Sequence, residues 1–345
     1  EFRRQTKVGL FSVIFSGGIG VILALKGFGV WSIVAQLLVS SLCRSFLLFW
    51  VSRWRPSFTF SVQSMRNMSS FSIRLLASVV MNQVINNIYF VIIGKLFSPS
   101  QVGFYARAKS LQDVPSDTVA GIVNRISFPF FSSMQGDSKQ LKNGLRKTLC
   151  LLVFIICPLM SGLAVIAHPL ISVLLTEAWL PCVPFFQLLC LLGIVLPVHA
   201  VLLNVPIALG KTDLFLALEI CKKALIVCSI LLLWRYGIEA LIIGHIIAAI
   251  FSLFMISYFS GRLISYSVRD QIKDTSLYVI LSALMAFAAH CIKYFEFNKP
   301  ISLLVMQCAC GCFVYYILCI VFKPLAFDVC RRAVMDRWKL VKFRI

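Results

Sequence analysis

Apolar runs of about 20 residues, separated by short polar segments, follow one another along almost the whole chain. A helix needs roughly 20 mainly apolar residues to cross a bilayer. The pattern therefore predicts an all-α integral membrane protein with about ten transmembrane helices. We expect these helices at residues 8–25, 30–51, 71–93, 113–131, 148–166, 183–208, 214–233, 238–259, 275–292 and 301–322.

The segments between the predicted helices differ in kind. Residues 94–112 form the longest predicted loop on the outer side. Residues 168–182 are apolar but short, which favours a re-entrant or interfacial piece. Pro197 and Pro206 fall inside the predicted helix at 183–208, and proline is expected to break a helix there.

The predicted helix at 71–93 carries a polar stripe. Arg74, Ser78, Asn82 and Asn86 recur every four residues, so they share one helical face. Polar groups at membrane depth are costly unless they meet protein, water or a ligand. The stripe indicates either a cavity wall or packing against a neighbouring helix, with Arg74 reaching the membrane surface.

Composition supports the membrane assignment and charge orients the chain. The sequence is 60% hydrophobic and 13% charged, with a net charge of +20. The basic residues occupy loops rather than an aromatic-rich patch, which favours a bilayer over nucleic acid. With the N-terminus inside, 21 of the 33 Lys and Arg residues lie on the inner side and 7 on the outer side. Both ends of this chain are therefore predicted to be cytoplasmic, in a multi-pass membrane protein.

A weak repeat suggests how the helices are grouped. The run Phe28-Gly29-Val30 opens one predicted helix, and Tyr236-Gly237-Ile238 opens another 208 residues later. Repeated halves are common in transporters. We therefore predict the last two helices of a first lobe, a cytoplasmic linker, a six-helix second lobe, two additional helices and a basic tail, at residues 1–51, 52–70, 71–259, 260–322 and 323–345 respectively.

Other polar residues inside predicted helices are candidates for a substrate cavity. Each has a simpler interpretation: Glu219 could pair with the lysines that follow it, an arginine near a helix end could reach the surface, and Asp113 and Asp117 could be solvated. His199 is expected to be a packing residue rather than a ligand-binding one. The candidates, with those of the stripe, are Arg44, Arg74, Asn82, Asn86, Asn87, Asn124, Arg125, Lys222 and Lys223.

We predict no metal site, cofactor or catalytic residue. The run Cys308, Cys310, Cys312 lies within an apolar helix, where alternate residues point in different directions. These thiols are expected to act as small apolar residues. No nucleophile–base arrangement appears in the sequence.

Three stretches resemble bacterial polysaccharide flippases, the polysaccharide transporters of the multidrug/oligosaccharidyl-lipid/polysaccharide (MOP) superfamily. KGFGVWSIVAQLLVSSLCRSFLLFWVSRWRP at residues 26–56 is similar to the middle of these proteins. NNIYFVIIGKLFSPSQVGFYARAKSLQDVPS at residues 86–116 is similar to their Asn, IGK and G-Y-x-R-A pattern. ISFPFFSSMQGD at residues 126–137 is similar to the end of the helix that follows the family's G-Y-x-R-A pattern. Many relatives carry an acidic residue where this chain has Tyr89, which puts a carboxylate role there in doubt. The matched positions are Asn87, Gly94, Lys95, Gly103, Tyr105, Arg107, Ala108, Pro115, Phe128, Pro129, Ser132 and Gln135.

The resemblance implies a two-lobed, MATE-like transporter fold and a function. It implies translocation of an undecaprenyl-diphosphate-linked oligosaccharide for lipopolysaccharide, capsule or exopolysaccharide synthesis. Membrane lipids and other polysaccharide-assembly proteins are the further expected partners. By the same comparison about four helices are expected to precede Glu1. The alternatives are a MATE-like drug or cation antiporter and a membrane polymerase or ligase of the same pathway.

Overall fold

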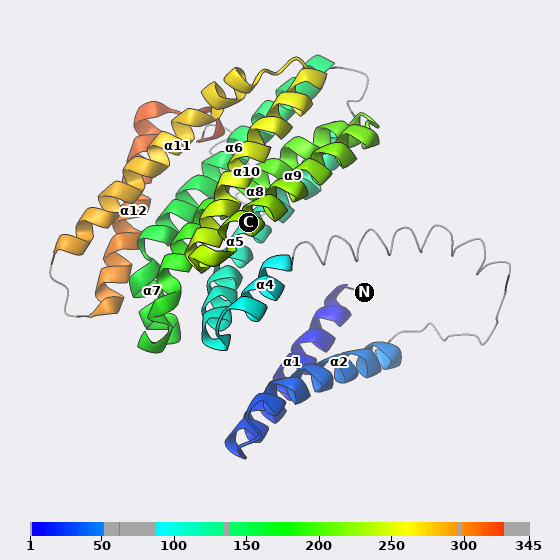
Figure 1. Cartoon of the computed structure of the whole chain (residues 1–345), viewed down its shortest axis with the longest axis vertical. Coiled ribbons are helices and arrows are strands. Elements are labelled where there is room, and N and C mark those ends of the chain that lie inside the picture. Colours follow the sequence, from blue (N-terminus) through cyan, green and yellow to red (C-terminus); the bar gives the residue numbers. More distant parts are fainter. Residues whose placement is uncertain (1, 52–61, 63–86, 134–137, 296–298, 328–345) are drawn as a thin grey trace, which may run out of the picture. The chain divides into compact units, whose positions relative to one another are not determined.

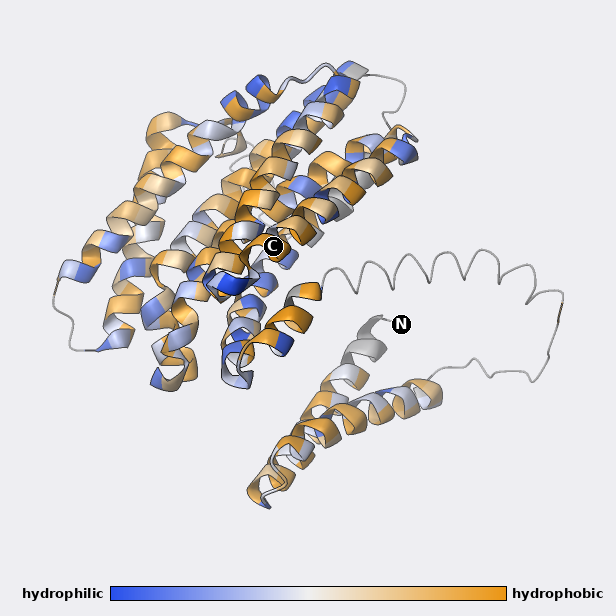
Figure 2. Ribbon diagram, in the orientation of Figure 1, coloured by the Kyte–Doolittle hydropathy of each residue, from blue (hydrophilic) through white to orange (hydrophobic). Residues whose placement is uncertain are grey.

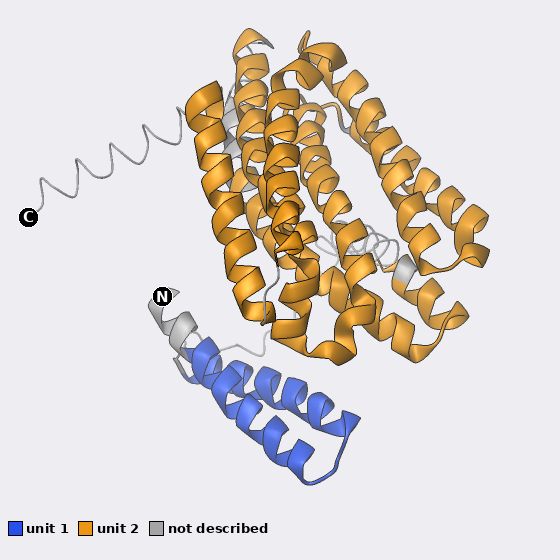
Figure 3. Ribbon diagram, turned by 90° about the vertical axis from the view of Figure 1, so that its left-hand side faces the viewer, with its two compact units in different colours: residues 1–80 blue, residues 81–345 orange. Residues whose placement is uncertain are grey.

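The computed structural model describes residues 2–51, 62, 87–133, 138–295 and 299–327, and all regular elements in these ranges are helices (Figure 1). The contacts divide the chain into two compact units, Glu1–Val80 and Met81–Ile345 (Figure 3). The predicted linker at 52–70 lies almost wholly outside the described residues. The finer domain division predicted from the sequence therefore stays a prediction.

The first unit contains a helical hairpin. Helices α1 (Phe2–Leu25) and α2 (Val30–Val51) pack against each other across a short turn. Gly27 and Gly29 take positive φ angles of 83° and 52° in that turn, a conformation that glycine adopts without steric cost. Both helices coincide with predicted spans, α1 with a start six residues earlier.

The second unit is a larger helical bundle. Each predicted helix from 148–166 to 301–322 has a counterpart here, with boundaries that differ by at most ten residues. The elements are α4 (Ile88–Leu96), α5 (Pro99–Ser133), α6 (Ser138–Val165), α7 (Ala167–Leu175), η1 (Glu177–Cys182), α8 (Val183–Ala208), α9 (Thr212–Leu233), η2 (Trp234–Tyr236), α10 (Ile238–Leu263), α11 (Val268–Cys291), η3 (Ile292–Tyr294) and α12 (Pro300–Phe322).

Helix α8 occupies the centre of this bundle. It packs against α5, α6 and α10, and its Phe186, Leu189 and Leu202 are almost fully buried. The sequence predicted a break at Pro197 and Pro206, but α8 continues through both prolines. Both are buried inside the bundle, where packing by neighbouring helices supports a helix that lacks two backbone donors.

The predicted outer loop at 94–112 is wrong, because most of it is helix. α4 ends at Leu96, and α5 begins at Pro99 and includes Pro115. The segment is polar enough to look like a loop, yet α5 buries one face, with Tyr105 and Ala108 2% and 0% exposed. Tertiary burial of that face stabilises a helix that hydropathy alone does not reveal.

Membrane crossing is apparent in most of the described helices. Seven of them are long and apolar enough to span a bilayer (Figure 2). Helices α5 and α9 are outside this set because they carry charged residues along their length. The seven stretches are Val8–Leu25, Val30–Trp50, Lys139–Val165, Glu177–Ala208, Ile238–Leu263, Val268–Tyr294 and Pro300–Phe322.

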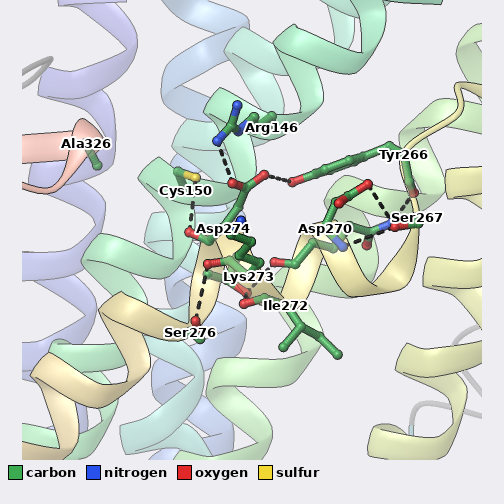
Figure 4. Close-up of polar contacts among 12 residues, drawn as sticks. Arg146, Cys150, Tyr266, Ser267, Asp270, Ile272, Lys273, Asp274, Ser276 and Ala326 are labelled. Atoms are coloured by element: carbon green, nitrogen blue, oxygen red, sulfur yellow. Dashed lines mark hydrogen bonds and ion pairs between the residues drawn. The ribbon is translucent and has the colours of Figure 1, made fainter.

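A polar elbow at residues 264–267 connects α10 to α11 and ties α11 to α6 (Figure 4). The Tyr266 hydroxyl donates to Oδ2 of Asp274 at 2.7 Å, and Nη2 of Arg146 on α6 donates to Oδ1 of Asp274 at 2.6 Å. Burial, and then the hydrogen bond to Asp274, raises the pKa of Tyr266 above its ordinary value. The phenol therefore stays protonated and remains a donor at physiological pH. Lys142 on α6 adds a hydrogen bond of 2.7 Å to the carbonyl oxygen of Ser265.

The elbow requires a residue without a side chain at Gly261. The Tyr266 N–H donates to the Gly261 carbonyl oxygen at 2.9 Å, so the chain turns back tightly on the end of α10. A β-carbon on Gly261 would lie 2.2 Å from the Tyr266 carbonyl oxygen and 2.7 Å from Nε2 of Gln271. The nearer of these is a backbone atom, which cannot rotate away.

We expect Gly261→Ala to lower the free energy of unfolding by roughly 1–3 kcal/mol, because it overpacks the elbow. Gly162→Ala is the matched control, since its β-carbon would meet only Cε of Met285 at 3.7 Å, an ordinary contact. Thermal unfolding of the two variants in the same detergent measures the difference. Equal unfolding temperatures for both variants would contradict the proposed steric requirement.

Candidate functional site

A polar cavity of about 640 Å³ lies within the second unit. Its wall comes from α4, α5, α8, α9 and α10. Six charged side chains face it, three lysines and three carboxylates, together with two histidines. All six charged side chains lie on α5 and α9, within a bundle of apolar helices. Charged groups in such surroundings usually mark a functional site. The charged members are Lys109, Asp113, Asp117, Glu219, Lys222 and Lys223.

Helix α5 contributes one charged strip to the cavity. Lys109, Asp113 and Asp117 follow one another at four-residue spacing, which places them on one helical face. Nζ of Lys109 and Oδ1 of Asp113 form an ion pair at 2.9 Å. Asp117 lies one turn further along and is exposed. Gln112, which is 2% exposed, also lines the cavity from this helix.

Helix α9 contributes a second charged strip near its middle. Glu219 forms an ion pair with Lys222, and its other carboxylate oxygen lies 3.9 Å from Nζ of Lys223. Each of the three side chains is only about one-fifth exposed, at 18–20%. One carboxylate thus serves two ammonium groups, which leaves this wall with an excess of one positive charge.

Helices α8 and α10 form the apolar part of the wall and carry its buried polar groups. His199 on α8 is 2% exposed, and its Nε2 lies 3.0 Å from the carbonyl oxygen of Ala249 on α10. His245 and Ser252 on α10 also line the cavity. The two helices therefore present imidazole and hydroxyl groups among leucine and alanine side chains.

Close packing between α5 and α8 depends on Gly193. The Ser116 hydroxyl on α5 donates to the Gly193 carbonyl oxygen at 3.1 Å. A β-carbon on Gly193 would lie 2.7 Å from both Nε2 of Gln112 and Sδ of Met160. Glycine at this position therefore lets the polar face of α5 approach α8 closely.

The charge distribution limits what the described wall can bind. Its three ammonium groups can bind phosphate or carboxylate oxygens, and its amide, hydroxyl and imidazole groups can bind sugars. Three carboxylates balance the three lysines, so this part of the wall has no excess of negative charge that would attract an organic cation. Among the described residues, no group of three or more His, Cys, Asp or Glu side chains could hold a metal ion.

The structure brings together three of the candidates from the sequence. Asn87, Lys222 and Lys223 all line the cavity, although substrate contact by any of them stays a prediction. Arg44 is exposed on α2 in the other unit. The remaining candidates are not described: Arg74, Asn82 and Asn86 lie outside the described residues, and Asn124 and Arg125 belong to α5 but their side chains are outside the described part.

Sequence reasoning missed much of the α5 wall. The sequence places Lys109 and Gln112 in a loop, and for Asp113 and Asp117 it leaves both a cavity position and a solvated helix end open. The available signal was the spacing of Tyr105, Lys109, Gln112 and the two aspartates, which follows a helical period. That signal is visible only if the helix is continued back to Pro99. His199, which was expected to pack, and His245 also line the cavity.

Comparison with known proteins identifies related sequences. Residues 1–184, just over half of the chain, match the family model described as "Polysaccharide biosynthesis protein". The chain is 33% identical over 191 residues to the succinoglycan biosynthesis transport protein ExoT of Rhizobium meliloti, covering 55% of this chain and 39% of ExoT. It is 28% identical over 223 residues to the teichuronic acid biosynthesis protein TuaB of Bacillus subtilis, covering 62% of this chain and 45% of TuaB. The matches thus span less than half the length of these two relatives.

A solved structure shares the fold. The lipid II flippase MurJ in its inward closed conformation aligns with a TM-score of 0.71 at 17% identity, covering 92% of this chain and 66% of MurJ. The lipopolysaccharide biosynthesis protein WzxC of Escherichia coli is a further relative, 25% identical over 197 residues, covering 56% of this chain and 40% of WzxC. The resemblance to polysaccharide transporters seen in the sequence is thereby confirmed. This multi-pass membrane protein has a MurJ-like fold and belongs to the polysaccharide biosynthesis protein family.

Proposed function

We propose that the protein flips an undecaprenyl-diphosphate-linked oligosaccharide across the bacterial inner membrane, for assembly of a surface polysaccharide. The observation that carries this proposal is a cavity with three lysines and several neutral polar groups inside a MurJ-like membrane fold. Such a substrate is an anionic diphosphate joined to a hydroxyl-rich glycan, and the cavity wall offers partners for both parts. ExoT is named a transport protein and MurJ a flippase, and both names support the same class of activity.

The lysines of α9 are the proposed diphosphate partners in the described wall. Lys222 and Lys223 share Glu219, so the pair retains net positive charge after internal pairing. A phosphate oxygen that enters the cavity can accept hydrogen bonds from these ammonium groups. Arg74, outside the described residues, is proposed as a further cation on the cytoplasmic side, with Arg125 as the second.

Transport without catalysis fits the names of the relatives better than a polymerase or ligase does. A drug or cation antiporter would need carboxylates in excess of cations. Here Asp113 pairs with Lys109, and Glu219 pairs with the α9 lysines. We therefore propose an anionic, lipid-linked substrate, with membrane lipids and polysaccharide-assembly proteins as neighbours.

The role of the α9 lysines can be tested without leaving an unpaired charge in the membrane. The triple variant Glu219→Gln, Lys222→Gln, Lys223→Gln removes the whole ion-pair group, so no unpaired carboxylate remains. We expect surface polysaccharide to fall at least tenfold at matched protein levels, because a charge-assisted contact to phosphate is lost. Lys211→Gln, at the exposed start of α9, is the control and should export normally. Normal export by the triple variant would remove the α9 lysines from the substrate route.

Arg74 can be tested by separating charge from geometry. Lysine retains the charge but loses the two-pronged contact of the guanidinium, whereas alanine loses both. In the intact transporter we expect Arg74→Ala to reduce polysaccharide export by roughly ten- to a hundredfold, and Arg74→Lys to give an intermediate value. Export equal to wild type in the alanine variant would mean that Arg74 only reaches the membrane surface.

The predicted orientation places the elbow between α10 and α11 in the cytoplasm and η1 in the periplasm. A reporter fused after Leu263 should therefore be active only if it is a cytoplasmic reporter. A reporter fused after Trp179 should be active only if it is a periplasmic one. Paired fluorescent-protein and alkaline-phosphatase fusions at both points measure this, and the reverse pattern would invert the topology.

A further inference from the structure

The neighbour of His199 determines which of its two ring nitrogens carries the proton in the neutral ring. Its Nε2 lies 3.0 Å from the Ala249 carbonyl oxygen, and a carbonyl oxygen can only accept a hydrogen bond. Nε2 therefore carries the proton and donates. In the neutral ring, Nδ1 is then a hydrogen-bond acceptor with a free lone pair.

This acceptor is buried without a partner among the residues that the structure describes. Most buried polar atoms in proteins are hydrogen-bonded, and an unpaired one costs free energy. An apolar side chain would avoid that cost, as Leu189, Leu192 and Leu196 do where α8 lines the same cavity. Packing alone therefore does not explain why a histidine, with an unpaired acceptor at Nδ1, occupies this position in the wall.

The chemistry of the acceptor selects one part of the proposed substrate. An ionised diphosphate offers only acceptor oxygens, so it cannot bind to Nδ1. In the described conformation Lys222 pairs with Glu219 and Lys109 pairs with Asp113, and Nδ1 of His199 has no described partner. Sugar hydroxyls and acetamido N–H groups are donors, and they match the lone pair of Nδ1.

We propose that His199 is a glycan-contacting residue, whose Nδ1 accepts a hydrogen bond from a hydroxyl or amide N–H of the sugar that enters this cavity. The inference rests on the proposed function. Nδ1 is buried in the conformation described here, so the contact requires a state of the protein in which the cavity reaches this atom. A site that pairs a buried acceptor with a substrate donor rejects analogues lacking that donor, so His199 contributes to glycan selection.

Two substitutions separate the roles of the two ring nitrogens of His199. His199→Gln can keep an N–H near the Nε2 position, and thus the bond to Ala249, but it removes the acceptor at Nδ1. His199→Asn places an amide near the Nδ1 edge and gives up the bond to Ala249. His290→Gln, on the exposed end of α11, is the control for the substitution itself.

The test compares two lipids on the intact protein in nanodiscs. One is undecaprenyl diphosphate, and the other is the lipid-linked oligosaccharide purified from cells that lack the transporter and accumulate it. Native mass spectrometry measures the dissociation constant of each. We expect wild type and His290→Gln to prefer the glycan-bearing lipid, and His199→Gln to lose about three- to tenfold of that preference with unchanged binding of undecaprenyl diphosphate. His199→Asn should retain more of the preference than His199→Gln.

Each other outcome has a distinct meaning. Full glycan preference in His199→Gln overturns the proposal, and so does a wild type that binds both lipids equally. If only His199→Asn loses the preference for the glycan-bearing lipid, the ring serves only to bind the Ala249 carbonyl. That result also overturns the proposal. If wild type binds neither lipid, the proposed function itself fails. If His199→Gln does not fold, His199→Asn is compared with His199→Leu instead. Equal glycan preference in these two variants then overturns the proposal.

Discussion

The charged side chains of α9 set the constraint that the cavity wall of the second unit has to meet. Three charged side chains near the middle of a membrane helix are costly in lipid, so α9 must turn them towards other charges or a polar space. Glu219 pairs with Lys222 and lies close to Lys223, and together they line the cavity. Helix α5 meets the same constraint with Lys109 and Asp113. The two long helices that are not among the seven span candidates therefore both belong to the cavity wall.

The rest of the unit supplies a rigid frame for that wall. Helix α8 packs on α5, α6 and α10 with almost fully buried side chains, and Gly193 allows α5 to come close. On another part of the unit, the elbow fixes α11 to α6 through Asp274, Tyr266 and Arg146. Polar groups near the membrane surface thus hold the outer helices, whereas apolar packing holds the centre.

The cavity divides its chemistry between two kinds of wall. The α5 and α9 strips carry charged groups, among which Lys109 pairs with Asp113 and Lys222 pairs with Glu219. The α8 and α10 wall carries neutral groups, among them the buried His199 acceptor. A lipid-linked glycan has the same division into a charged and a neutral part. The cavity lies within a MurJ-like fold, and this chain's own residues give its wall its chemical character.

The sequence by itself determined the apolar helices. Two of them, Val30–Val51 and Val183–Ala208, end where hydropathy placed their ends. A run of about 20 apolar residues has few alternatives in a bilayer, because every backbone polar group must be paired within the segment. The sequence also indicated Lys222, Lys223 and Asn87 as polar residues that need a polar environment.

Only the tertiary structure decided that residues 99–112 are helix, that α8 continues through its prolines, and which polar residues share a cavity. The helical state of a polar segment depends on the neighbours that bury one face, and those neighbours are far away in the sequence. Lys109 and Lys222 line the same space although more than a hundred residues separate them. The local sequence pattern does not indicate that two such residues line the same cavity, because packing between distant helices brings them together.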